Sequence, residues 1–156
     1  MADYFTKLSI AVDLPEPAAR WAIALADRLD RLAEDDELPS SGDAALDRAA
    51  SEIAAGEPMG TGCDWLYDQG RLWVSTDESA EPASITAVLQ RTLQRFELPE
   101  AITLQWSWDC SKPRADAFGG GAAIVTAGAI ETFSTAEWLD QQLARLAPTA
   151  CNQLQP

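Results

Sequence analysis

The chain of 156 residues carries 25 acidic and 11 basic side chains, a net charge of −14, and 47% of its residues are hydrophobic. It contains no histidine, which excludes Ser-His-Asp and Cys-His nucleophilic sites and zinc sites built on imidazole. A charge of this sign is repelled by nucleic acid and by anionic membranes, so we expect a basic protein as the partner, or a charge that only maintains solubility.

The first half of the chain predicts one strand and two helices. Apolar residues alternate over 4–14, which is typical of a half-buried strand. Pro15 and Pro17 end this strand and begin an amphipathic helix over 16–36. A weaker, alanine-rich helix follows over 43–55.

The middle of the chain predicts a hairpin, a helix and a strand. Two aromatic-rich runs in residues 63–76 flank Asp68-Gln69-Gly70, which favours a β-hairpin. A regular apolar stripe indicates a helix over 81–97, and the alternating residues 102–109 form a strand. That strand turns its tryptophans, Trp106 and Trp108, toward the core.

The C-terminal third predicts two short strands and a last helix. The strands cover 122–128 and 129–134, after a connection that holds the glycine triplet. Ser134 and Glu137 form a capping box, which opens a helix that ends before Pro148. We expect this helix to bury Trp138 and the leucines that follow it.

The element order β-α-α-ββ-α-β-ββ-α predicts an α+β fold, with a two-layer antiparallel or mixed sheet and helices on one face. Its first part is also compatible with a ferredoxin-like core that carries a C-terminal extension. We expect a single domain over 1–148 and a polar tail over 149–156.

The stretch "CSKPRADAFGGGA", residues 110–122, raises the question of a phosphate-binding loop. A phosphate loop needs a helix after its glycines, whereas a strand pattern follows Gly119, Gly120 and Gly121. The triplet therefore indicates a shaped strand connection with a contact role. Lys112 and Arg114 either contact a partner or pair with the chain's own carboxylates, such as Asp109 or Asp116.

The cysteines are Cys63, Cys110 and Cys151, which are too few and too scattered for a disulfide framework or a metal site. Cys110 is expected to be a buried, inert thiol, because no histidine can act as its base. We predict no catalytic residue, no metal and no cofactor. Without a secretory signal or an apolar run long enough to cross a bilayer, the expected location is cytoplasmic.

Two features suggest surfaces for a partner. An acidic patch forms from residues near the end of the first helix and the start of the second: Glu34, Asp35, Asp36, Glu37, Asp43 and Asp47. It could steer a basic protein or only hydrate the surface. Trp73 would be an interface anchor if its side of the hairpin faces outward.

The run "WSWDCSKPRADAFGGGAAIVTA", residues 106–127, resembles a signature of small uncharacterised proteins from bacteria, their phages and integrative elements. The matching features include the two tryptophans, the Cys-Ser-Lys-Pro-Arg run and the glycine triplet, and "TAEWL" at 135–139 resembles the same pattern. The resemblance implies a bacterial or mobile-element setting and no particular activity.

Three function hypotheses follow. The first is a non-enzymatic inhibitor of a host defence nuclease or nucleic-acid-binding complex, of the anti-CRISPR or anti-restriction type. It would act by steric block or by mimicry of nucleic acid. The second is a toxin-neutralising immunity protein, and the third is an anion-binding domain or small enzyme that uses residues 109–121. The oligomeric state is left open.

Overall fold

The structure is a computed structural model that describes residues 3–35, 38–56, 60–112, 114 and 117–146. Within this part of the chain, strands and helices follow one another in the predicted order. The strands are β1 (Tyr4–Asp13), β2 (Asp64–Asp68), β3 (Arg71–Thr76), β4 (Ile102–Cys110), β5 (Gly119–Val125) and β6 (Ile130–Ser134). The helices are α1 (Glu16–Glu34), α2 (Ala44–Ala54), α3 (Pro82–Arg95) and α4 (Thr135–Leu146).

The strands form one antiparallel sheet in the order β2-β3-β1-β4-β5-β6. Because β3 lies between β1 and β2, these two strands run parallel, and β1-α1-β2 is a split βαβ unit. The first four strands with α1 and α3 therefore have the ferredoxin-like arrangement, and β5, β6 and α4 extend it. The predicted α+β class is confirmed.

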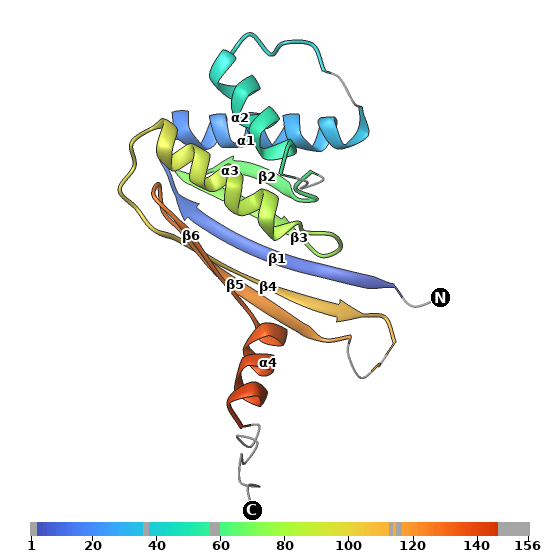
Figure 1. Cartoon of the computed structure of the whole chain (residues 1–156). Coiled ribbons are helices and arrows are strands. Elements are labelled where there is room, and N and C mark those ends of the chain that lie inside the picture. The colour runs from blue at the N-terminus through green and yellow to red at the C-terminus, as the bar shows by residue number, and fades with distance from the viewer. Residues whose placement is uncertain (1–2, 36–37, 57–59, 113, 115–116, 147–156) are drawn as a thin grey trace, which may run out of the picture.

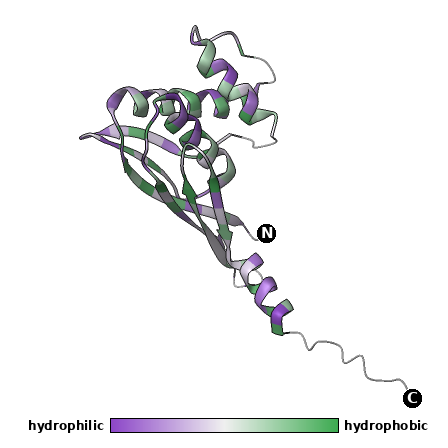
Figure 2. Cartoon of the chain, turned by 60° about the vertical axis from the view of Figure 1, so that its left-hand side comes forward, coloured by the Kyte–Doolittle hydropathy of each residue, from purple (hydrophilic) through white to green (hydrophobic). Residues whose placement is uncertain are grey.

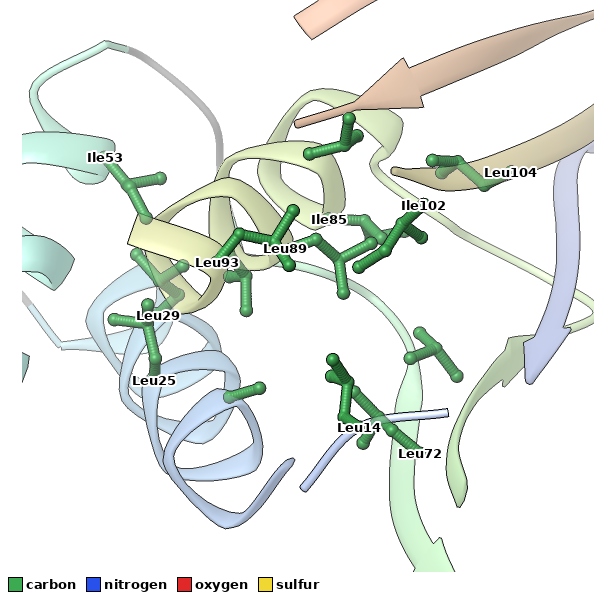
Figure 3. Close-up of a cluster of buried hydrophobic side chains, with 14 of the residues drawn as sticks. Leu14, Leu25, Leu29, Ile53, Leu72, Ile85, Leu89, Leu93, Ile102 and Leu104 are labelled. Carbon is green, nitrogen blue, oxygen red and sulfur yellow. The ribbon is translucent and has the colours of Figure 1, made fainter. Parts of the chain in front are cut away.

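Helices α1 and α3 cover one face of the sheet, α1 over β2 and β3 and α3 toward β5 and β6, while α2 packs on the outside of both (Figure 1). The hydrophobic core lies between these helices and the sheet. Leu25 and Leu29 of α1 pack toward Leu89 and Leu93 of α3, and Ile53 reaches the same cluster from α2 (Figure 3). We call the other side of the sheet the open face.

Local sequence explains where the elements begin and turn. Asp43 caps α2, since its side chain accepts hydrogen bonds from the amides of Ala45 (2.9 Å) and Leu46 (3.1 Å). Gln69 and Gly70 join β2 to β3 with positive φ angles of 49° and 82°. A two-residue connection of this kind matches the twist of the strands, so the predicted hairpin is confirmed.

The last helix differs from the prediction. We expected α4 to bury its apolar side chains, but Trp138, Leu139, Leu143 and Leu146 are exposed by 48, 53, 65 and 78%. The reason is that α4 continues away from the sheet after β6, so no described element lies across its apolar stripe (Figure 2). The predicted tail, 149–156, lies outside the described residues.

Candidate protein-binding surfaces

Two tryptophans of β4 lie opposite two glycines of β5. The register pairs Trp106 with Gly121 and Trp108 with Gly119. A Cβ atom on Gly121 would lie 2.2 Å from Cζ2 of Trp106, and one on Gly119 would lie 3.1 Å from Cε3 of Trp108. The indole rings therefore occupy the space next to the strand that side chains would otherwise fill.

The glycine triplet is part of a strand, so the prediction of a strand connection at these residues is wrong. Gly119, Gly120 and Gly121 pair with β4, and Gly121 also pairs with Ser134 of β6. Three residues without side chains carry no alternating pattern, which is why the sequence does not reveal the strand. Their amides belong to a β-ladder and do not form a cradle for phosphate.

A groove of about 320 Å³ lies beside the two tryptophans. The N-terminal ends of α3 and α4 border it through two acidic residues, the N-cap residue Glu81 of α3 and Glu137 in the first turn of α4. No lysine or arginine of the described residues lines it. Trp108 is 37% exposed here. The indole Nε1 of Trp106 is buried and has no acceptor among the described residues. We call this feature the tryptophan groove.

Among the described residues, the hydrogen bonds between α4 and the sheet lie at the start of the helix. The hydroxyl of Thr135 accepts a hydrogen bond from the amide of Gly120 (3.1 Å) and lies 3.2 Å from the carbonyl oxygen of the same residue. Ser134 Oγ accepts from the amide of Glu137 at 3.2 Å, as one half of the predicted capping box. Beyond this turn the apolar stripe described above is open to solvent.

The open face of the sheet carries a second exposed aromatic site. Trp73 is 43% exposed and lies opposite Leu66 of the edge strand β2, which is also exposed. The guanidinium of Arg71 is 5.7 Å from the centroid of the Trp73 ring and forms an ion pair of 2.8 Å with Asp13. Trp73 is thus on the outward side of the hairpin, and its role as an interface anchor stays a prediction.

The predicted acidic patch divides into exposed and engaged carboxylates. Glu34 and Asp35 are exposed at the end of α1, whereas Asp36 and Glu37 lie outside the described residues. Asp47 Oδ1 lies 3.0 Å from Nε of Arg28 and holds α2 against α1. Asp43 caps α2. These two residues therefore have structural roles.

Hydrogen bonds in this region lower the pKa of both engaged carboxyls. For Asp43 the main cause is the amide of Leu46. For Asp47 the main causes are the hydrogen bonds from Ser41 and Ser40. Both contacts favour the ionised form.

The two cations after β4, Lys112 and Arg114, form no ion pair with Asp109, one of the two partners that we expected. Lys112 and Arg114 are exposed, and Arg114 Nη1 lies 3.4 Å from the hydroxyl of Tyr4. Asp109 pairs instead with Lys7 of the adjacent strand at 2.8 Å, because both side chains lie on the open face. This contact lowers the pKa of Asp109 and raises that of Lys7. The other expected partner, Asp116, lies outside the described residues.

Neither of the two described cysteines is exposed. Burial, with Asp30 and Asp64 nearby, raises the pKa of Cys63 to about 12, so its thiol stays protonated at neutral pH. Cys110 is buried at the end of β4, as predicted. The described residues contain no cluster of three or more side chains suited to a metal ion.

Comparisons with known proteins give no relative: the chain matches no family model, no curated protein and no solved structure. None of the described helices is long and apolar enough to cross a membrane.

Sequence reasoning missed the tryptophan groove and the exposure of α4. The sequence holds only the spacing: Trp106 and Trp108 are two residues apart, and so are Gly119 and Gly121. The register of β4 with β5 shows that these residues face each other. Large side chains on one strand and glycines at the same spacing on the neighbouring strand are typical of cross-strand pairs.

Proposed function

We propose that the chain is a non-enzymatic binding protein that docks on a basic partner protein. The observation that carries this proposal is the apolar stripe of α4, which leaves Leu143 and Leu146 exposed by 65 and 78% on a chain of net charge −14. Contiguous exposed apolar surface marks protein interaction sites. The charge of the rest of the surface attracts a partner of opposite sign.

The partner class that fits this charge is a nuclease or another nucleic-acid-binding protein, since such proteins present basic surfaces. The chain would then be an inhibitor of the anti-CRISPR or anti-restriction type, which blocks the nucleic-acid site by bulk or by mimicry. The bacterial or mobile-element setting that the resemblance implies is part of this proposal.

The exposed carboxylates have a separate task in this proposal. Glu34 and Asp35 are exposed and would accelerate the encounter with a basic surface. Asp43 and Asp47 already cap and anchor α2, so their removal would disturb the fold as well as the charge. Steering should therefore be tested at Glu34 and Asp35.

The test is affinity capture of the tagged protein from bacterial lysate at low and high salt, read by mass spectrometry. We expect a stoichiometric basic nuclease or nucleic-acid-binding protein that high salt releases, because screening weakens the steering charges. A toxin captured in its place would make the chain an immunity protein. Capture of nothing at either salt concentration would contradict the proposal.

A matched pair of variants locates the surface. Leu143→Gln places a polar group in the α4 stripe, and Leu66→Gln does the same on the edge strand β2, where the side chain is similarly exposed. We expect the α4 variant to lose the partner and the β2 variant to retain it. The reverse result would move the binding surface to the open face around Trp73.

A further inference from the structure

The tryptophan groove combines two kinds of group that attract cations. The aromatic residues Trp106 and Trp108 line it, and so do the acidic residues Glu81 and Glu137. No ion pair between either glutamate and a lysine or arginine occurs within the described residues, although six such pairs involve other carboxylates. Among the described residues, the groove therefore places negative charge beside aromatic rings without a cation of its own.

The first turns of α3 and α4 also face this groove, and helix N-termini attract anions. Each contributes roughly half a positive charge, so two helices offset about one of the two full negative charges. Their amides are in part already used, because Ala83 donates to Glu81 Oε1 (3.4 Å) and Glu137 donates to Ser134 Oγ (3.2 Å). The remaining balance is negative, and the groove favours a cation.

The glycine strand fixes how the rings are presented. Because Gly121 and Gly119 lack side chains, the indoles rest close to the backbone of β5. A ring held in this way loses little conformational freedom when it binds a cation, which is the advantage of a preorganised site.

We propose that the tryptophan groove binds an arginine side chain of the basic partner; this inference rests on the proposed function and names the recognition element. A guanidinium is planar, stacks on indole faces and donates hydrogen bonds to carboxylates in a fork, whereas a lysine ammonium is compact and more strongly hydrated. The volume of about 320 Å³ lies at the lower end of the range for small-molecule pockets, which is sufficient for one guanidinium group.

The direct test uses N-acetyl-arginine methylamide as the probe and N-acetyl-citrulline methylamide as its uncharged isostere. Indole N–H signals of the isotope-labelled protein, assigned by single tryptophan substitutions, report binding. We expect saturable shifts at Trp106 and Trp108 with a dissociation constant in the millimolar range, and none at Trp73. Absence of saturation, or an equal response to citrulline, would overturn the proposal.

Two charge-neutralising variants sharpen this test. Glu137→Gln removes a carboxylate from the groove, and its side chain has no hydrogen-bond partner among the described residues. Glu131→Gln removes the same charge from β6 on the open face. We expect the first to weaken arginine binding by about three- to tenfold and the second to leave it unchanged. Equal effects of the two variants would show that arginine is attracted by the net charge of the protein and not by the groove.

Capture of the partner separates this inference from the proposed function. If Trp108→Leu and Glu137→Gln retain the partner that the unaltered chain captures, the arginine site is wrong and the binding function stands. If the unaltered chain captures nothing but binds the arginine probe, the groove stands and the proposed function fails. Loss of the partner in both variants, with the fold intact by circular dichroism, would support both.

Discussion

Helices α3 and α4 have the same kind of amphipathic sequence but different surroundings. Leu89 and Leu93 of α3 are fully buried against α1 and the sheet, whereas Leu143 of α4 is 65% exposed. Both stripes repeat at helical spacing, so periodicity alone does not separate them. The comparison shows that an apolar stripe predicts a helix that packs against another apolar surface. Only the tertiary structure tells whether that surface belongs to the same chain.

The face of the sheet that carries the helices also has a buried part and an exposed part. Beneath α1 and α3 its side chains are large and aliphatic, such as Leu72, Val74 and Ile102, and they form the core. Toward α4 the same face changes to tryptophan paired with glycine, and it borders a groove. One part of the face is thus closed to water, whereas the other borders the tryptophan groove and leaves Trp108 37% exposed.

The largest difference is expected from leucine truncation in the two helices. Leu89→Ala should lower the free energy of unfolding by about 2–5 kcal/mol, since it leaves a cavity in the core. Leu143→Ala should change it by less than about 0.5 kcal/mol, because its side chain already contacts water. Urea unfolding followed by circular dichroism measures both values. Similar losses would mean that α4 is covered within the monomer, and the comparison would fail.

The pairing of tryptophan with glycine can be broken at Gly121. In Gly121→Ala the new Cβ would lie 2.2 Å from Trp106 Cζ2 and 2.7 Å from the carbonyl oxygen of Phe133. We expect a loss of about 1–3 kcal/mol, as for other overpacked sites, measured by urea unfolding. Gly128→Ala is the control, since nothing lies within 4 Å of its added Cβ. A neutral Gly121→Ala would show that the indole does not rest on this strand.

The attachment of α4 can be loosened at Thr135. Thr135→Val keeps the shape of the side chain but removes its two contacts with the backbone of Gly120, at a cost of about 1 kcal/mol. Amide hydrogen exchange should accelerate in α4 and remain unchanged in α1 and α3. Thr103→Val, at an exposed position of β4, is the control. Unchanged exchange in α4 would mean that other contacts hold this helix.

The smallest expected effect is a pH dependence of stability that arises from two carboxylates at α2, Asp43 and Asp47. The pKa of Asp47 lies below its usual 3.8 in the folded chain, so the unfolded chain binds more protons near that pH. The stability that this carboxylate contributes is therefore complete at neutral pH and is lost as the pH falls below about 3.8. The same sign holds for Asp43.

Asp47→Asn should remove part of this dependence. We expect the urea midpoint of the variant to fall less between about pH 7 and about pH 3 than that of the unaltered chain. Glu34→Gln, at an exposed position near the end of α1, controls for the loss of one charge. A midpoint that falls equally in all three proteins would show that the hydrogen bonds from Ser41 and Ser40 to Asp47 do not contribute to acid stability.

The elements were largely predictable from local patterns. Alternation over 4–14 and 102–109 and the stripe over 81–97 record strands and helices that bury one side, and all three are present. The glycine triplet was not predictable as a strand, because alternation is a property of side chains. The ion pair of Asp109 with Lys7 was not predictable either, since it depends on which strand lies next to β4.

The sequence by itself determined the α+β class, the order of the elements and the acidic charge, because periodicity, capping residues and composition are local properties of the chain. The tertiary structure alone decided which apolar stripes are covered, which carboxylates are engaged and where tryptophan meets glycine. These features depend on strand order and register, which bring together residues far apart in the chain. The surfaces proposed here for a partner belong to this second group.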